Sequence, residues 1–230
     1  MHEHRHTRRS FLKKMGLASS CAALQFLGGG GKVRADAAVR KPNIVFVYTD
    51  DQAAWTLGAS GNPQARTPNL DRLASEGARL TNAFVTTPVC SPARAALMVS
   101  RYASELDIPD FIPHPGHKLY TEEMSNVGLD PKLVTFPEML AQAGYTNGLV
   151  GKWHVGDWTQ NTDDRFHPTN QGFHYFMGLT GGGTSPDNPP LEKDGKVQNF
   201  EGLTTDILTD HAIEFINKQQ LKEWINGNPL

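Results

Sequence analysis

A cysteine and an arginine stand four residues apart in the sequence Cys-Ser-Pro-Ala-Arg at residues 90–94. If a helix begins there, Arg94 returns beside Cys90 after about one turn, and Pro92 is tolerated because it falls in the first turn. The free N–H groups and partial positive charge of a helix start favour an anion. These features suit a nucleophile that acts on an oxyanion. A helix with a buried thiol and a surface arginine fits these residues equally well.

The first part of the chain is predicted to be an export signal and not part of the fold. Arg8 and Arg9 open the pattern Arg-Arg-Ser-Phe-Leu-Lys-Lys, which is typical of twin-arginine signals, and a modest apolar stretch follows. Ala-Asp-Ala at residues 35–37 has the small-x-small form of a signal-peptidase site. We therefore expect residues 1–37 to be a signal peptide for the twin-arginine translocase. Residues 38–230 would be exported to the bacterial periplasm or the extracellular space.

Cys90 would be the one cysteine of the mature chain, because the sequence has two and the other, Cys21, lies in the expected signal. Cys21 stands in a loose match to a lipidation site, so a lipoprotein is an alternative. The apolar stretch of the signal is shorter than the ~20 residues that span a bilayer, and a permanent anchor is not expected. A lone thiol in an exported protein cannot form an internal disulfide, which favours a chemical role for Cys90 over that of a buried inert thiol.

Further polar residues follow two predicted strands. Residues 43–48 are a continuous apolar run rich in β-branched residues, which predicts a strand covered on both faces, and Asp50 and Asp51 come just after it. Residues 145–150 predict a second interior strand, which leads into Gly-Lys-Trp-His at 151–154. Ligands tend to bind at the carboxyl ends of strands in open α/β sheets. Two adjacent aspartates can face one hard cation only where the strand ends and bends, and a solvated acidic turn is the alternative.

Helices are predicted between and after these strands. Residues 67–77 begin with Thr-Pro and end in Gly, residues 135–144 begin with a capping box of Thr135 and Glu138, and an apolar helical stripe runs through residues 207–216. Alternating strands and helices indicate an α/β fold. We expect a mixed, largely parallel sheet that is flanked by helices.

The remaining segments carry weaker patterns. A short strand is predicted at residues 80–85, and Leu70 and Leu73 are expected to pack on the sheet. The irregular stretches at residues 106–130 and 181–199 are predicted to be loops that line the entrance to the site. The composition, with 38% hydrophobic and 20% charged residues, is typical of a globular protein. A formal net charge of -2 gives no electrostatic case for a nucleic-acid partner.

Several segments together resemble one enzyme family. Residues 88–98, Pro-Val-Cys-Ser-Pro-Ala-Arg-Ala-Ala-Leu-Met, resemble the first signature of the type I sulfatases, which belong to the alkaline-phosphatase-like superfamily. Residues 144–154, Gly-Tyr-Thr-Asn-Gly-Leu-Val-Gly-Lys-Trp-His, resemble the second signature. Residues 41–51 and 67–71 are similar to the usual opening of the family. The resemblance implies an alkaline-phosphatase-like form of the α/β fold and the hydrolysis of sulfate esters.

The resemblance also implies a catalytic role for each of four residues. In the family the cysteine that corresponds to Cys90 is oxidised to formylglycine by a maturation enzyme. One hydroxyl of the hydrated aldehyde attacks sulfur, and the other collapses to the carbonyl and releases sulfate. Arg94 would hold the hydrated group, and Lys152 would contact the sulfate oxygens. His154 would hydrogen-bond the hydrate.

A divalent metal is implied as well. Asp50, Asp51 and the modified Cys90 would be ligands of calcium, the usual metal of the family, or of another hard divalent cation. Calcium takes about 6–8 oxygen ligands, which these three side chains supply only in part. Family members continue with further metal ligands, a histidine for the leaving group and a second lysine. We therefore expect residues 38–230 to be the N-terminal part of a catalytic domain, incomplete at its C-terminal end, with little activity alone.

Two positions depart from the family pattern. Val99-Ser100 stands where the family usually has Thr-Gly, and Asn147 stands where it has Ser or Thr. Both lie outside the proposed reactive side chains. Three other histidines are predicted to be structural or surface residues: His167, His174 and His211.

The leading hypothesis is a sulfuric ester hydrolase that acts on a sulfated small molecule or a sulfated polysaccharide, with a formylglycine-forming enzyme as its maturation partner. A phosphonate or phosphate monoester hydrolase of the same superfamily is an alternative, because related sites handle both tetrahedral anions. A non-catalytic binder of sulfated glycans is another. An aldehyde at Cys90 would favour an enzyme, and an unmodified thiol would favour the binder.

Overall fold

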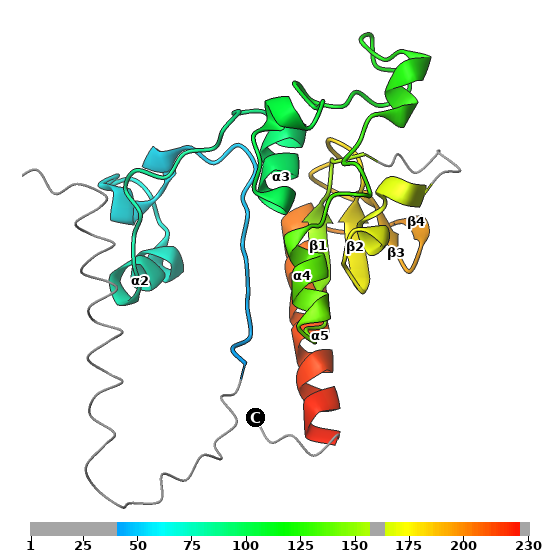
Figure 1. Cartoon of the computed structure of the whole chain (residues 1–230). Coiled ribbons are helices and arrows are strands. Elements are labelled where there is room, and N and C mark those ends of the chain that lie inside the picture. Colours follow the sequence, from blue (N-terminus) through cyan, green and yellow to red (C-terminus); the bar gives the residue numbers. More distant parts are fainter. Residues whose placement is uncertain (1–40, 157–163, 226–230) are drawn as a thin grey trace, which may run out of the picture. The chain divides into compact units, whose positions relative to one another are not determined.

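The computed structural model describes residues 41–156 and 164–225 (Figure 1). The expected export signal, its cleavage site and Cys21 lie outside the described residues. The chain divides into two units, Met1–Thr49 and Asp50–Leu230. No helix within the described ranges is both long and apolar enough to cross a membrane.

The second unit is built on a four-stranded mixed sheet. Its strands are β1 (Gly148–Lys152), β2 (Tyr175–Leu179), β3 (Pro190–Lys193) and β4 (Lys196–Asn199), and they lie side by side in chain order. β1 pairs with β2 in parallel, whereas the β2–β3 and β3–β4 pairs are antiparallel. The predicted α/β class with a mixed sheet is confirmed, but the prediction of a largely parallel sheet is wrong.

The β3–β4 pair is a hairpin in the stretch 181–199, for which the sequence predicts a loop. β3 and β4 are joined by the two residues Asp194 and Gly195, which both have positive φ, 54° and 74°. A two-residue turn with positive φ at both positions matches the twist of the flanking strands, and Asp-Gly is among its preferred sequences. The turn therefore converts the second half of this stretch into two short strands.

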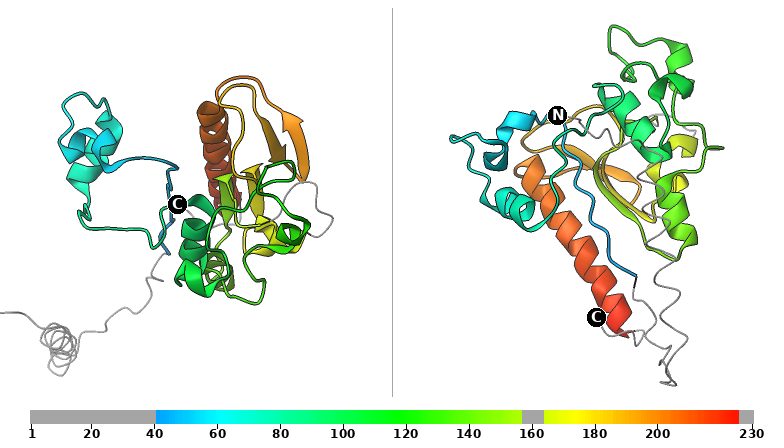
Figure 2. Two further views of the ribbon diagram at one scale, coloured as in Figure 1. Left: turned by 90° about the horizontal axis from the view of Figure 1, so that it is seen from above. Right: turned by 60° about the vertical axis from the view of Figure 1, so that its left-hand side comes forward.

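The two faces of the sheet are covered by different elements (Figure 2). Adjacent residues of a strand point to opposite faces. Tyr175 of β2 stacks on Phe215 of α5 (Thr204–Ile225) with ring centroids 5.1 Å apart, so α5 covers one face. Phe176 points to the other face and joins the main hydrophobic cluster, to which α3 (Cys90–Val99) contributes Ala95 and Met98. Phe215 of the predicted helical stripe thus packs on the sheet, whereas Ile216 of the same stripe is exposed.

The same cluster contains residues from both ends of the stretch 106–130, which the sequence predicts to be a loop. Ile108, Ile112 and Leu129 are almost fully buried in the cluster. The backbone N–H of Leu129 donates to the carbonyl of Val155, at 3.0 Å. These apolar residues are widely spaced and follow neither a helical nor a strand period. The hydrophobic pattern of the sequence therefore does not show that they are buried.

Two predicted helices are confirmed. α4 (Phe136–Gln142) begins with the expected capping box, in which Glu138 N–H donates to Thr135 Oγ1 at 3.3 Å and Thr135 N–H donates to Glu138 Oε2 at 2.7 Å. α2 (Pro68–Glu76) spans the predicted range. The expectation that Leu70 and Leu73 pack on the sheet is wrong, because both are exposed.

α2 instead joins a local group of turns through its polar side chains. Thr67 Oγ1 accepts from Gly58 N–H at 2.9 Å and donates to Asp71 Oδ1 at 3.0 Å, and Asp71 Oδ1 also accepts from Ala59 N–H at 2.7 Å. These bonds fix α2 to the preceding 3-10 turn. The 3-10 helices of the described chain are η1 (Ala54–Thr56), η2 (Gly58–Ser60), η3 (Ala103–Glu105), η4 (Glu122–Asn126), η5 (Asp164–Phe166) and η6 (Pro168–Asn170).

Two predicted strands are absent from the described chain. Residues 43–48 belong to the first unit and form no strand there, and their apolar side chains are exposed. Residues 80–85 likewise form no strand, and Leu80 and Phe84 are exposed. β-branched composition favours an extended backbone, but a strand also needs a neighbour that accepts its hydrogen bonds.

Candidate active site

Cys90 is the first residue of α3, as predicted from its motif. The residue is half-buried and its thiol is free. Pro92 lies in the first turn, where its missing N–H costs no intrahelical bond. Cys90 therefore stands where the first backbone N–H groups of a ten-residue helix lack helical partners, a setting that favours an anion.

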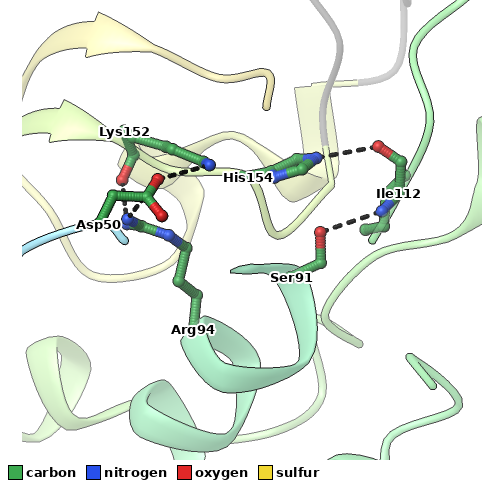
Figure 3. A network of polar contacts seen from close by, with 6 residues as sticks. All are labelled: Asp50, Ser91, Arg94, Ile112, Lys152 and His154. Carbon is green, nitrogen blue, oxygen red and sulfur yellow. Dashed lines mark hydrogen bonds and ion pairs between the residues drawn. The ribbon is translucent and has the colours of Figure 1, made fainter. Parts of the chain in front are cut away.

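Three charged side chains meet beside this helix start (Figure 3). Lys152, the last residue of β1, places its Nζ 2.6 Å from Asp50 Oδ2. Arg94 Nη2 lies 3.5 Å from the same oxygen, and Arg94 Nη1 donates to the Lys152 carbonyl at 2.6 Å. The side chains of Arg94 and Lys152 are largely buried, whereas that of Asp50 is 42% exposed. Two cations thus share one carboxylate at the carboxyl end of β1.

The charges around Asp50 decide its protonation. Partial burial alone would raise the pKa of this carboxyl, but the hydrogen bond and charge of Lys152 and the charge of Arg94 lower it more. The net pKa lies below the ordinary value, so Asp50 is ionised at neutral pH. Its charge offsets part of the positive charge of the two cations.

His154 follows β1 and is held by its backbone and by its ring. Its N–H donates to the Thr180 carbonyl at 2.9 Å, which extends the pairing of β1 with β2, and its φ of 55° turns the chain sharply. The ring Nε2 lies 2.9 Å from the Ile112 carbonyl, and the residue is only 2% exposed. Burial is the largest influence on His154 and lowers its pKa to about 4, with the charges of Lys152 and Arg94 acting in the same direction. His154 is therefore a neutral imidazole at pH 7.

The structure brings together four of the six candidate residues predicted from the sequence. Asp50, Arg94 and Lys152 are in direct contact, and His154 is close enough for its pKa to be affected by all three. Cys90 adjoins them as the start of the helix that carries Arg94. Asp51 is exposed and has a left-handed backbone with φ of 52°, so the predicted bend after Asp50 is present.

The carboxylates of Asp50 and Asp51 are the kind of oxygen ligand that calcium prefers, but they are not arranged as a calcium site. Within residues 41–156 and 164–225, no group of three or more histidine, cysteine, aspartate or glutamate side chains could hold a metal ion. Asp50 is bound instead by Lys152 and Arg94. The assignment of Asp50, Asp51 and the modified Cys90 as metal ligands stays a prediction.

The three histidines predicted to be structural have partners away from this site. His167 Nε2 lies 2.9 Å from Glu192 Oε1 of β3, and His211 Nδ1 lies 3.1 Å from Glu214 Oε2 of α5. His174 Nδ1 accepts from the backbone N–H of Asn147, at 3.1 Å. The contacts of His167 and His174 connect separate segments of the chain, whereas that of His211 lies within α5.

Three residues of the site neighbourhood were not predicted from the sequence. Ser91, Ile112 and Gly182 surround His154 or support its partner. Ser91 lies inside the recognised motif, which could have drawn attention to it. Ile112 contributes only its backbone and Gly182 only its lack of a side chain, so neither leaves a signal in residue type or spacing.

Comparison with known proteins places the chain in a family. A family model described as Sulfatase matches residues 42–225, and the chain belongs to the sulfatase family. Arylsulfatase D from Homo sapiens is 39% identical over 142 residues, which are 60% of this chain and 23% of that protein. N-acetylgalactosamine-6-sulfatase from Mus musculus is 32% identical over 204 residues, which are 81% of this chain and 38% of that protein.

Solved structures give the same result for the fold. Ps i-CgsB matches with a TM-score of 0.71 and 30% identity, over 80% of this chain and 43% of that chain. BT4656, solved in complex with its substrate D-Glucosamine-2-N, 6-O-disulfate, matches with a TM-score of 0.61 and 29% identity, over 77% of this chain and 31% of that chain. The chain spans less than half the length of each of these four proteins.

Proposed function

We propose that the protein is a sulfuric ester hydrolase and that its nucleophile is a formylglycine made from Cys90. The observation that carries this proposal is the meeting of Arg94 and Lys152 on Asp50 beside the helix start that bears Cys90. A sulfate ester is an anion, and two largely buried cations next to free backbone N–H groups suit its binding. Membership of the sulfatase family supports the same reaction.

The hydrated aldehyde would supply one hydroxyl that attacks sulfur and a second whose collapse to the carbonyl releases sulfate. Arg94 is held in place by the Lys152 carbonyl and by Asp50, and its guanidinium would hold the reacting group. Lys152 would turn its ammonium from Asp50 to the sulfate oxygens. Neutral His154 would hydrogen-bond the hydroxyl of the converted Cys90.

A hard divalent cation, with calcium as the first candidate, is proposed to bind the carboxylates of Asp50 and Asp51 and the converted Cys90. The adjacent carboxylates at a bend support this assignment, since calcium prefers oxygen ligands. Because Lys152 and Arg94 occupy Asp50 in the present arrangement, we route no chemical step through the metal.

The proposed partners follow from this chemistry. A formylglycine-forming enzyme would oxidise Cys90, and the substrate would be a sulfated small molecule or a sulfated polysaccharide. The complex of BT4656 with D-Glucosamine-2-N, 6-O-disulfate supports a sulfated sugar as one such substrate. We also propose export by the twin-arginine translocase to the periplasm or the extracellular space. That route would allow Cys90 to be converted before export, because it carries folded proteins.

Parallel assays would test the proposed reaction. A full-length version of the protein is purified from its native host and given matched aryl sulfate and aryl phosphate esters, with the Cys90→Ala variant as control. We expect release of the phenol from the sulfate ester, and a loss of at least about a thousandfold in the variant. Faster turnover of the phosphate ester would instead support the phosphonate or phosphate monoester hydrolase. Tight binding of sulfated glycans without turnover would support the non-catalytic binder.

A further inference from the structure

A chain of two hydrogen bonds connects the residue after Cys90 to the ring of His154 (Figure 3). The backbone N–H of Ile112 donates to Ser91 Oγ at 3.0 Å. The carbonyl of the same residue lies 2.9 Å from His154 Nε2. A carbonyl oxygen can only accept, so Nε2 must carry a proton and donate it. The backbone N–H of Ile112 is thus bound by Ser91, and its carbonyl binds His154.

This chain of bonds is shielded from water. Ser91 is 0% exposed, and Ile112 and His154 are each 2% exposed. Ile112 also belongs to the hydrophobic cluster, which fixes its side chain. Removal of the Ser91 hydroxyl would leave a buried N–H without its acceptor, at a place where water cannot easily replace it. Movement of the Ile112 backbone toward another acceptor would then displace the carbonyl that binds His154.

The His154 ring is confined near its Cε1 atom by a second element. A Cβ atom added at Gly182 would lie only 2.7 Å from His154 Cε1. The stretch that follows β2 therefore lies directly against the ring, and a neutral imidazole has only one N–H to place. With the ring confined in this way, the Ile112 carbonyl determines which nitrogen bears the proton.

We propose that Ser91 is a positioning residue for His154: through the Ile112 backbone it fixes the tautomer with the proton on Nε2 and Nδ1 as the acceptor. Nδ1 is separated from Nε2 by Cε1 and is turned away from Ile112 (Figure 3). In the reaction proposed above, an acceptor nitrogen could receive a hydrogen bond from a hydroxyl of the converted Cys90. The opposite tautomer would present a donor there and lose the bond to Ile112. The part of this inference that concerns catalysis rests on the proposed function, whereas the tautomer does not.

The tautomer is measured on the full chain labelled with nitrogen-15 histidine, by long-range proton–nitrogen correlation spectra at pH 7. Wild type is expected to show His154 as a single neutral form with the proton on Nε2. Ser91→Ala is expected to increase the population of the other tautomer at least about tenfold, and Ser91→Thr, which keeps the hydroxyl, to restore the wild-type pattern. Ser75→Ala is the matched control, because the Ser75 hydroxyl donates to the Arg72 carbonyl on exposed α2 and should leave His154 unchanged.

Two results would overturn the proposal. One is wild-type protein with the His154 proton on Nδ1, which needs no variant and so does not depend on the folding of Ser91→Ala. The other is a folded Ser91→Ala variant whose spectrum equals that of wild type. The catalytic part is tested separately by kcat per converted Cys90, which should fall about tenfold in Ser91→Ala while KM changes little. If the protein proves not to hydrolyse sulfate esters, the tautomer result stands unaffected.

Discussion

Acid should destabilise the folded chain through His154 in particular. The pKa of the folded ring is about 4, whereas the ordinary pKa of histidine is 6.5. Between these two pH values the unfolded chain binds a proton at this site and the folded chain does not. By linkage, the contribution of His154 to the free energy of unfolding is fully present above about pH 6.5 and is lost as the pH falls toward 4.

The size of the effect follows from the separation of the two pKa values. Each unit corresponds to about 1.4 kcal/mol, so the full loss is about 3 kcal/mol, and most of it has occurred by about pH 4.5. No large discount for solvent applies, because His154 is only 2% exposed. This is a large fraction of the stability of an ordinary domain, which is about 5–15 kcal/mol.

Urea denaturation at pH 7 and pH 4.5, followed by tryptophan fluorescence, measures this loss. Trp153 is buried directly beside His154 and reports on the same region. Other groups also titrate, so wild type is compared with His154→Gln, which cannot be protonated but keeps an N–H donor for the Ile112 carbonyl. We expect the pH-induced loss to be about 2–3 kcal/mol smaller in this variant. The exposed His114 provides the control His114→Gln, which should keep the wild-type loss. An equal loss in His154→Gln and wild type would refute the reasoning.

Three further substitutions have defined expected outcomes. Asn147→Ser should cost about 2 kcal/mol in denaturant unfolding, because the Asn147 side chain donates to two backbone carbonyls, at 2.6 Å and 2.9 Å, and a serine can reach at most one; an unchanged midpoint would contradict this. Ser100→Gly should raise stability by about 0.5–1 kcal/mol, because Ser100 ends α3 with φ of 54°; a lower melting temperature would contradict it. Asp50→Asn should cost no more than about 1 kcal/mol at low salt, because Asp50 is partly exposed to solvent, and the cost should shrink at 1 M salt as the bond to Lys152 is screened; a salt-independent cost would argue against that ion pair.

The sequence predicted those parts of the fold whose cause is local. The helix after Cys90 and the capping box of α4 depend on residues within one or two turns, and both are confirmed. The sequence predicts a strand at residues 145–150, and β1 spans Gly148–Lys152. Asn147, which departs from the family pattern, lies at its start and bridges two backbone segments, a role that no local pattern shows.

Features that depend on distant partners were missed or mispredicted. The run at residues 43–48 has the composition of an interior strand, but pairing depends on a neighbour that composition does not specify. The buried Ile112 has no periodic companions in its stretch, although its carbonyl binds His154 at 2.9 Å. The meeting of Asp50 with Lys152 joins residues 102 positions apart. Their places after two predicted strands and the family resemblance suggested a shared site, but not this ion pair.

The most direct test of the central claim is the mass of the tryptic peptide that contains Cys90, which runs from residue 80 to Arg94, in protein from the native host. Conversion of the thiol to an aldehyde makes this peptide about 18 mass units lighter than its sequence mass. We predict that the lighter species is the major form and that sulfate-ester hydrolysis rises in proportion to it. A preparation that hydrolyses sulfate esters while its Cys90 remains entirely a thiol would contradict the account.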